Sequence, residues 1–92
     1  MQYIAIATFP RDDSKTSQEV LARRRHYAYP PDFKNTRSYL DAHGGRAVVL
    51  FETTSAESIL RYTSDWPELE FDIFPVVLTE KGWEAYLNDP RP

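Results

Sequence analysis

The chain has 92 residues, of which 41% are hydrophobic and 14% aromatic; it contains no cysteine and carries a formal net charge of −3 at pH 7. This composition excludes a disordered polymer, a disulfide framework and a thiolate metal site. The acidic balance argues against binding to nucleic-acid phosphates, and no apolar run approaches the ~20 residues of a membrane span. We therefore expect one cytoplasmic domain over residues 1–92, with no nucleic-acid and no membrane partner.

The first third of the chain predicts a strand followed by a helix. Residues 2–9 have strand character, and the turn residues of 10–14 end the strand. A capping box at 16–19 predicts a helix that runs to about residue 28, where two prolines stop it. The core-facing stripe of this helix is expected to consist of Val20, Leu21, Arg24, Tyr27 and Ala28.

A pair of glycines, Gly44 and Gly45, joins two strand-like runs at 36–43 and 46–53. Two adjacent glycines between such runs predict a β-hairpin with a two-residue turn, because both turn residues need positive φ. This turn sets the register of the hairpin. The expected cross-strand pairs are His43 with Arg46, Asp41 with Val48, Tyr39 with Leu50, and Arg37 with Glu52.

The remaining elements complete a known strand and helix order. A second capping box at 54–57 predicts a helix to about Trp66, and 69–78 predicts a strand in which Pro75 requires an edge position. A last helix at 80–87 is expected to lay Trp83, Tyr86 and Leu87 on the body of the domain. The order β-α-β-β-α-β predicts an α+β, ferredoxin-like sandwich: a four-stranded antiparallel sheet in the order 4-1-3-2, with two helices on one face plus a short C-terminal helix.

Alternation along the four strands divides their residues into two faces. One set is almost wholly apolar and is expected beneath the two helices. The other set mixes apolar residues with charged ones, and no helix remains to cover it. Leaving its large apolar side chains in water would forgo roughly 1.5–3 kcal/mol each, so we expect a homodimer packed sheet to sheet. The apolar members of this second set are Ile4, Ile6, Val48, Leu50, Phe74 and Val76.

An aliphatic centre with a polar fringe is typical both of a small-molecule pocket and of a plain dimer interface. His43 beside Arg46 fits a general base next to an anion-binding cation, although a turn position favours simple exposure to solvent. Arg37 opposite Glu52 fits a carboxylate-binding pair, although a cross-strand ion pair is commoner. The candidate ligand-binding residues are Arg37, Tyr39, His43, Glu52 and Asp72.

Two further groups have a functional and a structural interpretation. Tyr62 and Trp66 lie one helical turn apart and suit stacking on an aromatic ligand, although a tryptophan before Pro67 more often marks a packed helix end. The run 23–26 is densely positive and suits docking of a phosphate or an acidic partner, although on a helix such side chains more often fan out into solvent. No motif indicates a catalytic residue, a metal site or a cofactor.

The segment 45–54, followed by Arg61, Trp66 and the segment 71–77, resembles the domain-of-unknown-function 3303 family of small bacterial and archaeal proteins. Glu52, Trp66 and Pro75-Val76 match its pattern of a strand ending in Glu-Thr, a helix ending in Trp and a strand ending in Pro-Val. The resemblance implies a ferredoxin-like fold related to the dimeric α+β barrel proteins, and it implies no activity. Strand two, with Tyr39 and His43, departs from the family's usual Arg-Trp-His-like run.

Three functions follow from these observations as hypotheses. The first is a homodimer that binds a small, partly apolar ligand between its sheets. The second is a cofactor-independent oxygenase or isomerase of the dimeric α+β barrel type, which requires His43 or a carboxylate to face a cavity. The third is a structural or regulatory module that recognises another protein through strand two or the arginine-rich helix face. The sequence does not decide whether the protein is an enzyme.

Overall fold

The computed structural model describes residues 1–10 and 14–87, so the predicted turn at 10–14 lies partly outside the described residues. The elements follow the predicted order, with one additional helix at the end of the chain, as expected. They are β1 (Gln2–Thr8), α1 (Ser14–Arg24), β2 (Lys34–Leu40), β3 (Arg46–Glu52), α2 (Ala56–Ser64), β4 (Glu70–Val76) and α3 (Thr79–Leu87).

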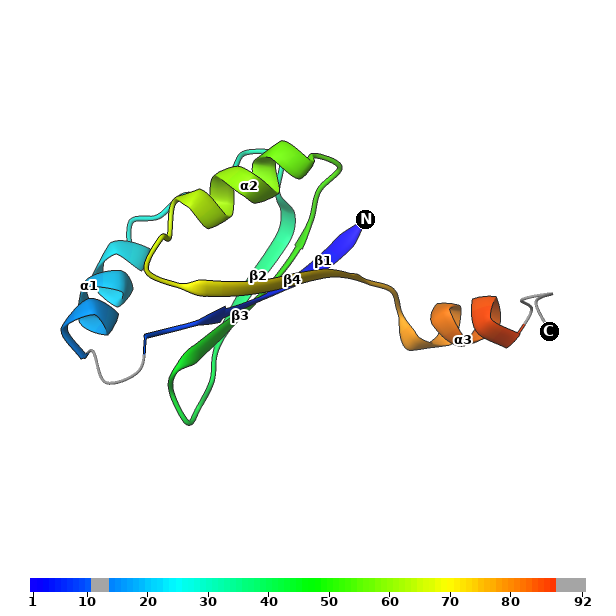
Figure 1. Cartoon of the computed structure of the whole chain (residues 1–92). Coiled ribbons are helices and arrows are strands. Elements are labelled where there is room, and N and C mark those ends of the chain that lie inside the picture. The colour runs from blue at the N-terminus through cyan, green and yellow to red at the C-terminus, as the bar shows by residue number, and fades with distance from the viewer. Residues whose placement is uncertain (11–13, 88–92) are drawn as a thin grey trace.

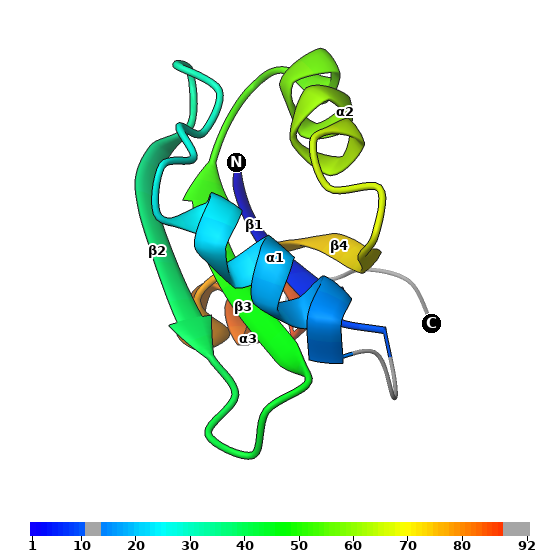
Figure 2. The same ribbon diagram turned by 90° about the vertical axis from the view of Figure 1, so that its left-hand side faces the viewer.

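The strands form one sheet in the order β2-β3-β1-β4, and every neighbouring pair is antiparallel. Both α1 and α2 lie on the same side of this sheet (Figure 1), and α1 crosses in front of it when the view is turned (Figure 2). Pro75 lies on β4, at an edge of the sheet, where a missing backbone donor is tolerated. The ferredoxin-like fold, the strand order and the edge position of Pro75 are thus confirmed.

The core lies between the sheet and the two helices. Alternate residues of β1 and β3 point to it, including the buried Ala5, Val49 and Phe51. Each helix adds a large apolar group, and α2 contributes the most through Tyr62, with Trp66 just beyond its end. The predicted division of the sheet into a covered and an open face is therefore observed.

Helix boundaries differ from the prediction by a few residues. The helix α1 begins at Ser14, so the capping box expected at 16–19 lies inside it, and it ends at Arg24 rather than near Ala28. There the backbone tightens into a turn, in which Tyr27 N donates to Arg24 O at 3.2 Å. The N-cap of α2 is Ser55, one residue later than expected, and its hydroxyl accepts from Ser58 N.

The hairpin register was predicted wrongly. The ladder ends at Leu40 opposite Ala47, and residues 41–45 connect the two strands; Gly44 and Gly45 in this loop both have positive φ. The loop is wider because Asp41 accepts a hydrogen bond from Gly44 N at its backbone oxygen. From Arg37 to Leu40 the partner on β3 therefore moves by two residues; Tyr39 lies opposite Val48, not Leu50. A shift of two leaves each side chain on its predicted face.

A β-bulge near the start of β2 separates Arg37 from Glu52. Lys34 lies opposite Glu52 and Arg37 opposite Leu50, so the residues between them have one fewer partner on β3. Asn35 absorbs the distortion with a φ of 53°, a conformation that asparagine tolerates better than most residues. The predicted pairing of Arg37 with Glu52 is consequently wrong, and Asn35 Nδ2 donates to Glu52 at 3.1 Å instead.

The helix α3 does not pack on the body of the domain, contrary to prediction. It lies beyond the end of β4, away from α1 and α2 (Figure 1). Trp83 is 58% exposed and Leu87 is 74% exposed, while the side chain of Tyr86 lies outside the described part of the structure. The radius of gyration is 15.8 Å, whereas a compact domain of this length has about 12 Å. The arm formed by α3 accounts for this extended shape.

Candidate functional site

The five predicted ligand-binding residues do not form one cluster. Arg37 and Tyr39 come from β2, Glu52 from β3 and Asp72 from β4, and their strand positions place them on the open face of the sheet. His43 lies in the hairpin loop. Asp72 lies far from Glu52. Both of their strands pair with β1, but the β1 partner of Asp72 is Ile6, whereas the β1 partner of Glu52 is Gln2, toward the other end of that strand.

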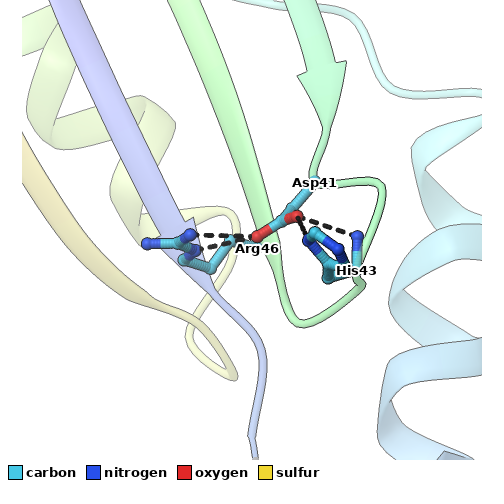
Figure 3. A network of polar contacts seen from close by, with 3 residues as sticks. All are labelled: Asp41, His43 and Arg46. Atoms are coloured by element: carbon cyan, nitrogen blue, oxygen red, sulfur yellow. Dashed lines mark hydrogen bonds and ion pairs between the residues drawn. The ribbon is translucent and has the colours of Figure 1, made fainter.

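Asp41 is the centre of the polar network at the hairpin (Figure 3). Its carboxylate accepts from Arg46 Nε at 3.1 Å, from Arg46 Nη2 at 3.0 Å and from the backbone N–H of His43 at 2.9 Å. The hydrogen bond from His43 N, together with those from Arg46, holds the pKa of Asp41 below its usual value. The His43 side chain is 99% exposed. This network orders the loop, and His43 faces solvent rather than a cavity.

Arg37 and Glu52 share a shallow polar hollow on the open face. Its volume is about 370 Å³, and it also includes Gln2, Asn35 and Leu50. The structure therefore brings together two of the five predicted residues, although not as a cross-strand pair. Tyr39, His43 and Asp72 do not line this hollow.

A more apolar cavity lies on the other face, between α1 and the sheet. Its volume is about 270 Å³. The floor is formed by β3 through Ala47 and Val49, and α1 contributes Val20 and Leu21. The sequence-based interpretation placed these residues in the core but did not predict a space between them. Small side chains on the sheet, alanine above all, leave that space unfilled.

Aromatic side chains form one wall of this cavity. Tyr62 and Trp66, which were predicted either to stack on a ligand or to pack at a helix end, are both buried and both line it. Tyr29 adds a third ring, with its centroid 5.6 Å from that of Tyr62. Burial raises the pKa of the Tyr62 hydroxyl, so this group is neutral near pH 7.

Two arginines at the end of α1 behave differently. Arg23 makes a bidentate pair with Glu68, at 2.7 and 3.0 Å, and its guanidinium lies over the Trp66 ring. That pair lowers the pKa of Glu68 and raises the pKa of Arg23. Arg24 instead lines the cavity, with its guanidinium Cζ 5.1 Å from the centroid of Tyr29. Arg24 therefore lies toward the core, as predicted for the core-facing stripe of this helix, whereas Arg23 is exposed but paired with Glu68.

Within residues 1–10 and 14–87, no group of three or more His, Cys, Asp or Glu side chains is placed to hold a metal ion. The same part of the chain includes no helix that is both long and apolar enough to span a membrane.

The fold defines an α+β domain of the ferredoxin-like kind with an open sheet face. The chain matches the family described as "Domain of unknown function (DUF3303)" over residues 1–88, and it therefore belongs to this family. No curated protein matches the chain significantly. Among solved structures it is similar to Rv0793 from Mycobacterium tuberculosis, with 15% sequence identity and a TM-score of 0.46 over 85% of this chain and 97% of that one.

Proposed function

We propose that this protein is a homodimeric domain that binds a small, partly apolar molecule in the cavity between α1 and the sheet. The observation that carries this proposal is the cavity itself: about 270 Å³ of space, mostly apolar walls and a few polar side chains. That combination is typical of small-molecule sites, in which apolar contact supplies affinity and a few polar groups set orientation. The volume is near the lower limit for such sites, which favours a small ligand.

The homodimer is supported by the open face of the sheet. Phe74 is 38% exposed and Tyr39 is 52% exposed, and the apolar residues between them are only half-buried. A second copy packed on this face would cover the apolar centre, with charged residues such as Arg37 and Asp72 at the rim.

Native mass spectrometry of protein purified from its own host tests both parts of the proposal, because it reports subunit count and retained molecules together. We expect a dimer that carries additional mass. The variant Ala47→Phe, which fills the cavity floor, should lose that mass and remain a dimer. Ala22→Phe, at an exposed position on α1, is the matched control and should keep the additional mass. A bare monomer from the unaltered protein would contradict the proposal.

The site predicted from sequence is tested by the same spectrum. If the ligand lies between the sheets, Arg37→Ala should lose the additional mass while Ala47→Phe keeps it. If it lies beneath α1, the two variants should show the opposite result. The hollow beside Arg37 and Glu52 is wide but mainly polar, which is why the cavity beneath α1 is the stronger candidate for a partly apolar ligand.

The two alternative functions receive less support. An oxygenase or isomerase with His43 as its base requires that side chain to face a cavity, and it faces solvent. A module that recognises proteins through the arginine-rich helix face would use Arg23, which is already engaged with Glu68. Both stay hypotheses from the sequence.

A further inference from the structure

Among the described residues that line the cavity beneath α1, Arg24 is the one cationic group. This residue is the last of α1 and lies one helical turn after the buried Val20, so its side chain projects from the same helix face toward the sheet. It is half-buried, and its guanidinium lies against the Tyr29 ring, another part of the cavity wall. The contact with Tyr29 restricts where the charge can move.

The charge of Arg24 is not balanced by a carboxylate within the described part of the chain. Its neighbour Arg23 has the bidentate pair with Glu68, but no ion pair between described residues includes Arg24. The guanidinium is also not needed to cap α1, because the carbonyl oxygens of Arg23 and Arg24 already accept from His26 N and Tyr27 N. A partly desolvated cation with open donors favours an anionic partner.

The remainder of the wall indicates what the anion should be attached to. Phe9, Tyr62 and Trp66 add aromatic surface to the cavity wall. Flat rings stack favourably on such surfaces. The volume of about 270 Å³ is small for a ligand site, which favours a single ring over a long chain or a nucleotide. A guanidinium matches the two oxygens of a carboxylate in a planar, bidentate geometry.

We propose that the ligand of this cavity is a small aromatic carboxylate, held by apolar contact with the aromatic wall and by an ion pair between its carboxylate and Arg24. This inference rests on the proposed function, since it requires the cavity to be a binding site. It goes further by naming the chemical class of the ligand and the residue that selects it.

Two probes with the same body test this selection: cinnamate and cinnamyl alcohol, titrated by isothermal calorimetry into the unaltered protein. Hydrogen bonds to charged groups are stronger than neutral ones, so cinnamate should bind at least about tenfold more tightly than the alcohol. Arg24→Met keeps an apolar stem and removes the charge; it should bind both probes equally. Arg24→Lys should restore part of the preference. Arg25→Met, at an exposed position next in sequence, should leave the preference unchanged.

The outcomes separate this inference from the one it rests on. Equal binding of both probes by the unaltered protein would overturn the assignment of Arg24 while leaving the cavity as a binding site. A preference for cinnamate that survives in a folded Arg24→Met variant would overturn it as well. If neither probe binds at millimolar concentration, the proposed function fails and the inference fails with it. Circular dichroism of each variant establishes that it is folded.

Discussion

The ring of Phe33 stacks on the ring of Phe51, with centroids 4.2 Å apart and 3° between the ring planes. Phe51 is the largest fully buried side chain among the described residues, and Phe33 covers it from the segment between α1 and β2. This contact attaches an irregular segment to the central strand β3. Its loss should therefore affect the whole domain rather than the segment alone.

We expect Phe33→Ala to lower the free energy of unfolding by about 3–5 kcal/mol, as for other buried phenylalanines. A domain of this size has only ~5–15 kcal/mol in total, so a large fraction of the stability would be lost. Urea denaturation followed by circular dichroism measures this change. Leu60→Ala, at an exposed site on α2, is the control and should change the free energy by no more than about 0.5 kcal/mol. A loss below 1 kcal/mol for Phe33→Ala would show that the stack is unimportant.

Phe33 also shows why part of the core was not predictable from the sequence. Residues 30–33 have neither helical nor strand periodicity, and Phe33 is positioned by a turn in which its N–H donates to Pro30 O at 3.0 Å. Hydrophobic periodicity identifies core residues only within regular elements. The strands, where the period is clear, were predicted with their correct faces.

For the candidate site, too, the features set by a local pattern were predicted and those set by tertiary contacts were not. The alternation of β1 to β4 predicted the open face correctly, because alternation depends only on each strand. The register of the hairpin depends on the turn closed by the hydrogen bond from Gly44 N to Asp41 O, and the position of Arg37 depends on a bulge that Asn35 makes possible. The cavity beneath α1 depends on how closely a helix approaches a sheet. These are tertiary relationships, and no local pattern encodes them.

The hairpin loop requires glycine because of its backbone conformation and not because space is limited. Gly44 and Gly45 have φ values of +82° and +85°, and a Cβ atom added at either would meet nothing within 4 Å. Gly45→Ala should therefore lower the free energy of unfolding by about 1–2 kcal/mol through backbone strain, measured by urea denaturation. Gly45→Asn is the matched variant, and it should cost less because asparagine tolerates this conformation. Equal losses for both variants would contradict a backbone origin.

Asp32 connects the segment before β2 to the start of α2, and this connection should be sensitive to acid. Its carboxylate accepts from Ser58 Oγ at 2.6 Å and from Thr53 Oγ1 at 2.7 Å. The hydrogen bonds from Ser58 and then Thr53 lower the pKa of Asp32 in the folded protein. A carboxyl group whose pKa is lower in the folded protein than in the unfolded chain stabilises the fold when the pH is above its pKa in the unfolded chain, which is ~3.9. That contribution disappears as the pH falls through the folded value.

Asp32→Asn should consequently reduce the melting temperature near neutral pH, and the difference from the unaltered protein should shrink below pH ~4. Calorimetric melting curves across this range give the comparison. Glu70→Gln, at an exposed position on the edge strand β4, serves as the control and should leave the melting temperature near neutral pH unchanged. A difference that stays constant down to pH ~2 would mean that the charge of Asp32 does not contribute.

The arm formed by α3 should be dispensable for folding of the domain. Its large side chains Trp83 and Leu87 are mostly exposed, and it lies away from the core (Figure 1). A chain that ends at Leu78 should therefore retain a single cooperative unfolding transition, with a free energy of unfolding within about 1 kcal/mol of the complete chain. Loss of cooperative unfolding would show that α3 supports the sheet in a way that its exposure does not indicate.

The open face of the sheet should be required for dimerisation and not for folding. Phe74, on the edge strand β4, is partly exposed. In the variant Phe74→Lys, the ammonium group of the new side chain therefore stays in water as long as the protein is a monomer. In a sheet-to-sheet dimer the same lysine would be desolvated, which costs 2 kcal/mol or more when no partner is available. We expect sedimentation equilibrium to give a dimer dissociation constant at least about tenfold higher than for the unaltered protein. Leu60→Lys, on the opposite layer, should not change it. Equal dissociation constants for the two variants would place the interface elsewhere.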